Sequence, residues 1–308
     1  MQSWQADVVN TWLSLSLKPA LRHVNSLRVI RTAMRLADTC GGRLAKTGNS
    51  NAVDFDSPSG HCSLKWLTRN DGNPASSRVI LYLPGGAYIM RTPQLHRALV
   101  SRICREADAS ALICFYRLAP EHPFPAGLED ALEAYDFVLA GGHEPNSIAI
   151  AGDSAGGGLA LSLLLAIRDS GRPLPGCSVL MSPLLDATDH APSRTRNSKT
   201  DSALPHPMRR GVNPRAMYIG EHDPKDPLIS PIYGSFEALP PVYILVSDSE
   251  MLLDDSLRLA RKAHIYQTEV RVDVWRKVPH VWVSMPFLPE SVDGVNRIGK
   301  FIREKLAC

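Results

Sequence analysis

The chain has 308 residues, 44% of them hydrophobic, and its 34 basic residues nearly balance 31 acidic ones. This length and composition predict a soluble globular protein with a large core, built as one large α/β domain or two smaller ones. A formal net charge of only +3 argues against a nucleic-acid-binding protein. Residues 1–50 are locally basic, with a formal charge of +5. We expect a solvated helix face there, with attraction to anionic surfaces as the lesser alternative.

Six cysteines are scattered along the chain without a C-x-x-C pair or a His-Cys cluster at zinc spacing. They predict neither a disulfide framework nor a metal site, and reduced thiols favour a cytoplasmic protein. The apolar patch at 8–17 has no basic flank before it and no small-residue cleavage site after it, so we do not expect a secretory signal. No run approaches the roughly 20 apolar residues that a membrane span requires.

The predicted elements begin with helices over residues 1–40, because Trp4, Val8, Trp12 and Leu15 fall on one helical face. Residues 61–69 alternate as a strand does. Apolar strands and amphipathic helices then follow one another: strands at 77–83, 111–116, 147–152, 177–182, 242–247 and 269–275, and helices at 93–107, 127–140, 155–169, 253–265 and 290–305. This alternation predicts an α/β fold with a mostly parallel sheet and helices on both faces.

Residues 186–217 interrupt the alternation, because they are polar, proline-rich and only weakly helical. A long excursion inside a compact domain is usually functional. We therefore expect 1–45 and 186–217 to form a helical cap over the C-terminal edge of the sheet. The α/β domain would then consist of residues 46–185 and 218–308.

The segment Gly152-Asp153-Ser154-Ala155-Gly156 lies between a predicted strand and a predicted helix. This is the context of the G-x-S-x-G nucleophile elbow, in which glycines permit a strained turn and close backbone approach. The Ser154 hydroxyl would project at a helix N-terminus, whose dipole favours developing negative charge. Ser154 is the candidate nucleophile, and the alternative is a plain Gly-rich helix start.

Two further motifs carry a family resemblance. The loop after the strand at 77–83 reads PGGAY, and residues 116–131 read YRLAPEHPFPAGLEDA. Together with the elbow, they resemble the hormone-sensitive-lipase-type esterases of the α/β-hydrolase fold. In that family the loop reads HGGG, so Pro84 replaces the histidine and Ala87 replaces the last glycine.

The resemblance implies an oxyanion hole made by the backbone N–H groups of Gly85, Gly86 and Ala155. Pro84 removes a side chain that helps to fix this loop in the family, and its restricted φ would fix the loop instead. A turn that needs glycine only for tight geometry is the alternative. In residues 116–131 we expect Arg117, Glu121 and Asp130 to act as ionic anchors of the scaffold.

The candidate general base is His280, one of ten histidines. It follows the predicted strand at 269–275, and α/β-hydrolases carry their triad in the order Ser, acid, His. It also resembles the catalytic histidine of the family.

The acid is expected in the stretch SDSEMLLDDS at 247–256. By the family pattern Glu250 aligns with the catalytic acid, while Asp248 and Asp254 remain alternatives. At a helix start, Asp254 and Asp255 would complement the dipole, and Asp254 would pair with Arg258. Asp248 would shape the loop as an Asx-type turn.

These assignments predict a serine carboxylesterase that acts on a small-molecule ester through an acyl-enzyme, with no metal and no organic cofactor. The resemblance implies short acyl chains, and Trp4, Trp12 and Tyr88 are candidate residues for the acyl pocket. An amidase, a thioesterase or a deacetylase would use the same triad, and a non-catalytic ligand-binding receptor of this fold is a further alternative. The run 269–275 is a candidate sheet edge for a homodimer, although simple core burial is equally consistent with it.

Overall fold

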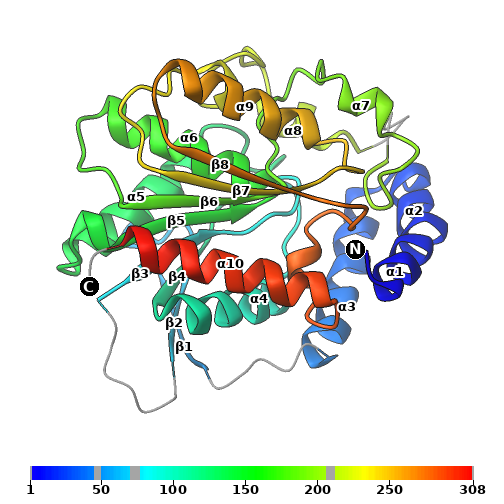
Figure 1. Cartoon of the computed structure of the whole chain (residues 1–308), viewed down its shortest axis with the longest axis horizontal. Coiled ribbons are helices and arrows are strands. Elements are labelled where there is room, and N and C mark those ends of the chain that lie inside the picture. Colours follow the sequence, from blue (N-terminus) through cyan, green and yellow to red (C-terminus); the bar gives the residue numbers. More distant parts are fainter. Residues whose placement is uncertain (1, 45–49, 70–76, 206–211, 307–308) are drawn as a thin grey trace.

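An eight-stranded sheet forms the centre of the computed structural model, which describes residues 2–44, 50–69, 77–205 and 212–306 (Figure 1). The strand order is β1-β2-β4-β3-β5-β6-β7-β8. Strand β2 pairs antiparallel with both β1 and β4, and all the other pairs are parallel. The strands are β1 Ser50–Asp56, β2 Ser63–Arg69, β3 Val79–Leu83, β4 Ser110–Phe115, β5 Ile148–Asp153, β6 Cys177–Met181, β7 Val242–Ser247 and β8 Val270–Trp275.

Helices cover both faces of the sheet, with α4 and α10 on one face and α5, α6 and α9 on the other (Figure 1). The helices are α1 Trp4–Leu15, α2 Leu17–His23, α3 Leu27–Leu44, α4 Pro93–Ala107, α5 Ala126–Ala140, α6 Ala155–Asp169, α7 Ser193–Arg196, α8 Pro214–Ile219, α9 Leu253–Ile265 and α10 Pro289–Lys305. Three short 3₁₀ turns are η1 Pro145–Ser147, η2 Pro231–Tyr233 and η3 Trp282–Ser284.

The central strands are apolar along their whole length because both faces of the sheet are covered. In β3, Leu81 packs into the core under α5 and α6, whereas its neighbours Ile80 and Tyr82 pack under α4 and α10. All five residues of β3 are buried. Successive side chains of a strand point to opposite faces, so a strand between two helical layers must be apolar at every position. The predicted mostly parallel α/β sheet is confirmed.

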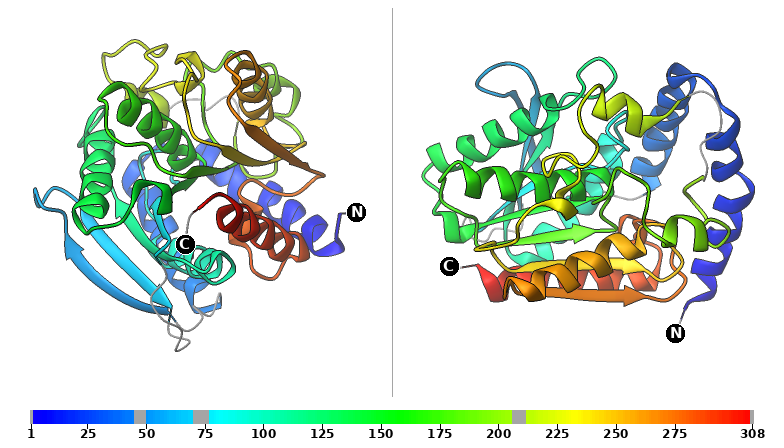
Figure 2. Two further views of the ribbon diagram at one scale, coloured as in Figure 1. Left: turned by 60° about the vertical axis from the view of Figure 1, so that its left-hand side comes forward. Right: turned by 90° about the horizontal axis from the view of Figure 1, so that it is seen from above.

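The first three helices lie at the end of the sheet toward which the parallel strands point (Figure 2). Helix α7 lies at the same end, close to α1 and α2 (Figures 1 and 2). Residues 45 and 206–211 of the expected cap lie outside the described residues, as does Cys308.

Strand β1 was not predicted from the sequence. It pairs along its whole length with β2, from Ser50 opposite Arg69 to Asp56 opposite Ser63. Only two large apolar side chains, Val53 and Phe55, mark it, and Asp54 separates them. An alternation this short is too weak to predict a strand from the sequence alone.

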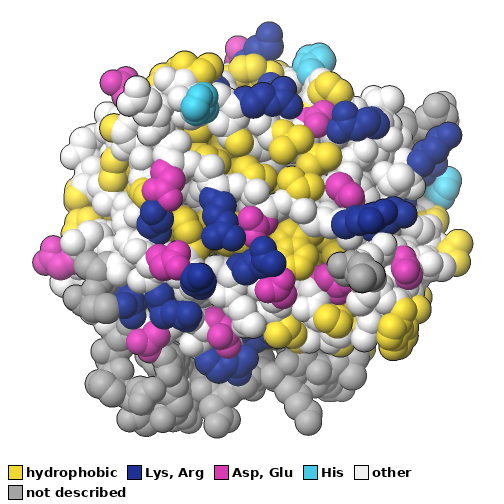
Figure 3. All heavy atoms as spheres, viewed as in Figure 1, with side chains coloured by type: hydrophobic (Ala, Val, Ile, Leu, Met, Phe, Trp, Pro, Cys, Tyr) yellow, Lys and Arg dark blue, Asp and Glu magenta, His cyan; other side chains and the backbone are white. Residues whose placement is uncertain are grey.

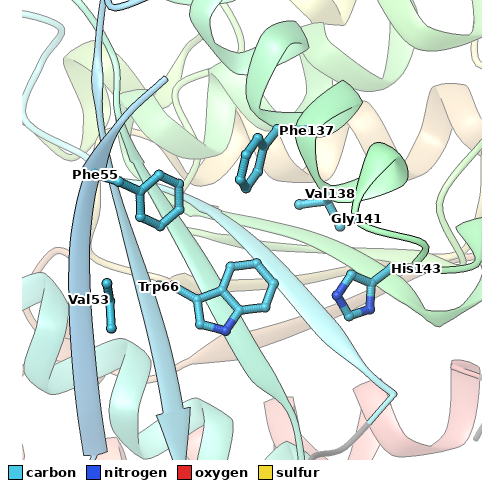
Figure 4. Close-up of a pocket in the computed structure, with 7 residues that line it drawn as sticks. All are labelled: Val53, Phe55, Trp66, Phe137, Val138, Gly141 and His143. Carbon is cyan, nitrogen blue, oxygen red and sulfur yellow. The ribbon is translucent and has the colours of Figure 1, made fainter. Parts of the chain in front are cut away.

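Under β1 and β2 lies a hollow of about 380 Å³, shown in Figure 4. Phe55 of β1 contacts Phe137 of α5, with ring centroids 5.3 Å apart, and Trp66 of β2 stacks on His143 at 5.8 Å. Aromatic packing of this kind accounts for how the antiparallel end of the sheet is attached to α5.

Five cysteines lie within the described residues, and all five are free thiols. In the same part of the chain, no helix combines the length and the apolar character needed to cross a membrane.

Candidate active site

Ser154 lies in a sharp turn between β5 and α6. Its φ of 53° and ψ of −121° fall in a region that non-glycine residues rarely occupy. Glycine is required on both sides, because a Cβ on Gly152 would come within 2.3 Å of the Gly156 carbonyl oxygen, and a Cβ on Gly156 within 2.0 Å of the Leu83 carbonyl oxygen. The turn is held by the Ser154 N–H, which donates to the Met181 carbonyl at 2.8 Å. The elbow geometry predicted from the motif is present.

The structure brings Ser154, His280 and Glu250 into one hydrogen-bonded chain. The Nε2 atom of His280 lies 2.9 Å from Ser154 Oγ, and its Nδ1 atom lies 2.6 Å from Glu250 Oε2. Glu250 is 1% exposed and the His280 side chain 10% exposed. This is the relation of nucleophile, base and orienting acid that an acyl-transfer triad requires.

Glu250 is held by further hydrogen bonds that the sequence did not predict. Its Oε1 atom accepts from the Ser182 hydroxyl at 2.8 Å and from the Ser247 N–H at 2.9 Å. Ser182 follows β6 directly, has a positive φ of 48°, and also accepts from the Val281 N–H at 3.2 Å. Ser182 therefore connects the acid loop with the histidine loop, and only the fold brings its partners together.

The neighbouring aspartates have other partners. Asp248 accepts the Lys277 N–H at 2.7 Å, so it joins the loop after β7 to the loop after β8. The expected pair of Asp254 with Arg258 is wrong, because Asp254 instead accepts from the Ser193 N–H at 2.8 Å and from Arg196 at 3.0 Å. Within the described residues, neither carboxylate forms a hydrogen bond or ion pair with His280, whose Nδ1 atom is paired with Glu250.

Arg258 and Asp255 serve the segment that follows β6. Arg258 pairs with Asp186 at 2.5 Å, and Asp255 pairs with the buried Arg194 at 2.8 Å. Asp255 also accepts the Leu185 N–H at 2.9 Å. These contacts fasten the start of α9 to the segment 186–217.

Two opposing effects set the pKa of His280. Burial acts to lower it, but the charge of Glu250 and the hydrogen bond to that carboxylate outweigh burial, so the pKa lies above its ordinary value. A raised pKa means that the imidazolium is well stabilised once it takes up a proton. It also means that the neutral, basic form predominates only at more alkaline pH.

The expected oxyanion donor Gly85 is not supported by the geometry. Its N–H donates to the buried Asp153 carboxylate at 2.9 Å, and a Cβ at Gly85 would come within 2.3 Å of the same group. Within the described residues, the N–H groups of Gly86, Ala87 and Ala155 have no hydrogen-bond partner. Ala87 adopts a positive φ of 53°, a conformation usually reserved for glycine.

Beneath the elbow, Asp153 binds three groups. It accepts from the Tyr82 hydroxyl at 2.7 Å and from Gly85, and it pairs with His96 at 3.2 Å. Burial acts to raise the pKa of Asp153, but the His96 charge and these hydrogen bonds outweigh it, so the pKa is lowered. Asp153 is therefore an ionised carboxylate that anchors the loop after β3 to the strand that carries Ser154.

The oxyanion loop has a second anchor at Pro84. Its carbonyl accepts the Tyr116 hydroxyl at 2.7 Å. Tyr116 opens the segment 116–131, in which Arg117 pairs with Asp130 at 2.8 Å and Glu121 pairs with Arg31 at 2.5 Å. The anchoring role expected for this segment is confirmed.

A cavity of about 290 Å³ adjoins these groups. Its wall includes Ala87 of the oxyanion loop, Met251 beside Glu250, and Leu184, whose N–H donates to the Ser154 carbonyl at 2.9 Å. Leu21 of α2 and Ile30 of α3 close it from the N-terminal helices.

Of the three aromatic residues expected in this pocket, only Tyr88 lines it. It stacks on Tyr218 with ring centroids 3.6 Å apart. Trp4 and Trp12 are 72% and 63% exposed and do not line the cavity, so that expectation was wrong.

Comparison with known proteins agrees with this geometry. A family model described as the alpha/beta hydrolase fold matches residues 80–284. An acetyl-hydrolase from Streptomyces hygroscopicus is 39% identical over 247 residues, which cover 79% of this chain and 80% of that protein. A crystal structure of EstE5 soaked with p-nitrophenyl butyrate matches with a TM-score of 0.88 and 34% identity, and covers 98% of this chain and 99% of that one. An esterase from the bacterial hormone-sensitive lipase family matches over 100% of both chains with a TM-score of 0.89 and 33% identity. The chain belongs to the α/β-hydrolase family, in the hormone-sensitive-lipase group of esterases.

Proposed function

We propose that Ser154, His280 and Glu250 hydrolyse carboxylic esters in two steps. The chain is an enzyme of the carboxylic ester hydrolase class, in line with the names of its relatives. The observation that carries the assignment of residues is the unbroken chain of hydrogen bonds from Ser154 Oγ through both nitrogens of His280 to Glu250.

In the first step, the Ser154 oxygen attacks the acyl carbon while its proton passes to Nε2 of His280. The resulting oxyanion is held by backbone N–H groups, and we propose Gly86, Ala87 and Ala155 for this role because Gly85 already donates to Asp153. His280 then gives the proton to the leaving alcohol. In the second step, water repeats the sequence on the acyl-enzyme and releases the acid.

We propose that 1–45 and 186–217 form a cap that shapes the substrate pocket. Leu21 and Ile30 of the N-terminal helices support this role, as do Leu204 and Pro214 of the second segment, because all four line the cavity beside the triad. A volume of about 290 Å³ lies just below the usual range for ligand pockets, about 300–1,000 Å³. It supports acyl groups from acetate to about hexanoate.

The pocket volume also defines a measurement of the acyl range. Hydrolysis of p-nitrophenyl esters should fall steeply beyond about six acyl carbons, because the cavity is too small for much longer chains. A rate that rises steadily to palmitate would contradict the short-chain assignment.

A second activity on amides, thioesters or N-acetyl groups would use the same triad.

We also infer a cytoplasmic location, supported by the free thiols of the described residues. A homodimer through β8 is supported by the position of this strand at one end of the sheet order. Analytical ultracentrifugation tests the homodimer. If it forms, the measured mass should rise with protein concentration to twice the mass of one chain.

Replacement of the nucleophile tests the proposed function. Ser154→Ala should lower kcat/KM for p-nitrophenyl butyrate by about 10³-fold or more, since the residues of a triad act as a unit. Ser14→Ala is a matched control, because Ser14 lies exposed on α1, away from the cavity wall. Hydrolysis unaffected by Ser154→Ala would place the chemistry elsewhere.

A further inference from the structure

Helix α1 carries apolar side chains on two faces, and the fold uses only one of them. Ala6 and Leu13 on the inner face are buried and Val9 packs beside them. The outer face exposes four side chains at helical spacing: Trp4 (72% exposed), Val8 (59%), Trp12 (63%) and Leu15 (77%). We call these four residues the outer face of α1.

Exposure of this kind is unusual in a soluble protein. Single apolar side chains on a surface are ordinary, but a contiguous apolar stripe marks a contact site. Two of the five tryptophans of the chain lie in this one stripe. Tryptophan has a large apolar ring with one polar N–H, and it is enriched where an apolar phase meets water.

The helices that follow α1 carry exposed basic side chains, whereas α1 itself carries only Asp7 as a charged residue. Arg22 and His23 of α2 are exposed, as are Arg28 and Arg35 of α3. No ion pair between any of these three arginines and the described residues occurs. Figure 3 shows hydrophobic, basic and acidic side chains close together at the edge of the molecule formed by α1 and α2.

The N-terminal helices contain two acidic residues, which offset only part of this charge. Asp38 is 3% exposed and accepts the Gln94 and Leu95 N–H groups, so its charge faces the interior. Asp7 is exposed on α1 and retains its negative charge, because the group that donates to it at 2.6 Å is the neutral Gln2 amide; the net basic charge of the segment therefore comes from α2 and α3.

We propose that the outer face of α1, together with Arg22, docks on an anionic lipid surface. The apolar stripe would enter the boundary between headgroups and acyl chains, while the guanidinium groups meet lipid phosphates. The helix would lie in the plane of the surface without spanning it.

The position of this face relates it to the pocket. Leu21 of α2 lines the cavity, and the next residue, Arg22, belongs to the docking face, by which we mean the outer face of α1 together with Arg22. Docking would therefore place a cavity-lining helix at the lipid–water boundary, where apolar esters concentrate. This second statement rests on the proposed function, whereas the docking itself does not.

A second copy of the chain fits the same face less well. In a two-fold dimer the same patch meets itself, so the arginines of one copy would approach those of the other. An anionic bilayer buries the apolar stripe and also neutralises the basic charge.

Vesicle co-sedimentation tests the proposal. The purified full chain is mixed with phosphatidylcholine vesicles that contain or lack phosphatidylglycerol. Binding is expected for the anionic vesicles, with a shift of tryptophan emission to shorter wavelength, and high salt should weaken it. The double variant Trp4→Ala/Trp12→Ala should lower the affinity more than tenfold, because two large apolar groups no longer insert. Arg22→Glu should lower affinity by about fivefold or more for anionic vesicles only.

Ile265→Ala provides the matched control, since Ile265 is 77% exposed at the end of α9 and lies outside the docking face. It should bind as the wild type does. Ser154→Ala should bind equally well, so a failure of the proposed function would leave the docking intact. Ile265→Ala, which lies outside the proposed cap, should hydrolyse a soluble p-nitrophenyl ester at the wild-type rate.

Three outcomes would overturn the proposal. The first is no binding to anionic vesicles at low salt, and the second is equal binding by the double tryptophan variant. The third is a concentration-dependent dimer that the double variant abolishes while vesicles bind neither protein. That result would assign the face to a contact between copies.

Discussion

Replacement of Glu250 by glutamine removes one negative charge from the triad and keeps the size of the side chain. The carboxylate is almost fully buried and contacts Nδ1 of His280 at 2.6 Å. When His280 takes the proton of Ser154, the imidazolium forms next to this charge. Glu250→Gln should therefore raise the barrier to acyl transfer and leave the substrate pocket unchanged.

The size of the effect follows from the ion pair. Two unit charges about 4 Å apart interact by about 4 kcal/mol at an effective dielectric constant of about 20. A barrier higher by this amount corresponds to a rate about 10³-fold lower. Because the effect is confined to the transition state, kcat should fall while KM for p-nitrophenyl butyrate stays within about threefold of wild type.

Steady-state kinetics of three proteins provide the assay: wild type, Glu250→Gln and Asp248→Asn. Asp248 lies in the same loop but accepts only the Lys277 N–H among the side-chain contacts described, so Asp248→Asn should retain kcat within about tenfold. Equal losses in both variants, or a loss below tenfold in Glu250→Gln, would refute the assignment of Glu250 as the acid.

Three other predictions concern the charges around the site. The kcat/KM of wild type should rise with pH through an apparent pKa above 6.5, because the pKa of His280 is raised, and Glu250→Gln should move this midpoint to lower pH; a flat profile between pH 5 and 8.5 would contradict His280 as the base. Asp153→Asn should lower the free energy of unfolding by about 3 kcal/mol, since it breaks a buried ion pair, and kcat should fall because Gly85 loses its charged anchor; urea titration and kinetics measure both, and a variant as stable and active as wild type would refute the anchor. Burial acts to lower the pKa of His96, but the charge of Asp153 and the hydrogen bond to it outweigh burial, so the pKa is raised. The ion pair with Asp153 therefore stabilises the fold fully below the unfolded pKa of about 6.5, and this stabilisation is lost as pH rises through the higher folded pKa. In thermal unfolding, His96→Asn should lose most stability near pH 6 and less above pH 9, and a loss that does not depend on pH would count against the ion pair.

The central α/β alternation could be predicted because its signals are local. The periodicity of apolar residues and the turn at Ser154 are properties of short segments, and each segment forms in the structure the element that its local pattern predicts. Glu250 and His280 required the family resemblance as well, because four acidic residues lie in one stretch and ten histidines in the chain.

The errors concern partners that are distant in the sequence. The N–H of Gly85 is taken by Asp153, which lies 68 positions away, and no local pattern indicates this contact. Asp254 binds Arg196 of the segment 186–217 and not its helical neighbour Arg258. In each case the fold brings a distant residue close, and this residue binds the group that had been assigned to another role.

The sequence also did not predict which face of α1 packs against the core. Helical spacing correctly places Trp4 and Trp12 on one face, but α1 is apolar on two faces, and periodicity does not say which of them meets the core. The inner face is filled by small and medium side chains such as Ala6 and Leu13, so the large rings remain outside.

The rate at which a fluorophosphonate labels Ser154 tests most directly whether this hydroxyl is activated by His280. Peptide mapping of the wild type should find one label per chain, on Ser154, and His280→Ala should slow the labelling by at least about 10³-fold. Label on another residue, or an equal rate in His280→Ala, would contradict the assignment of nucleophile and base.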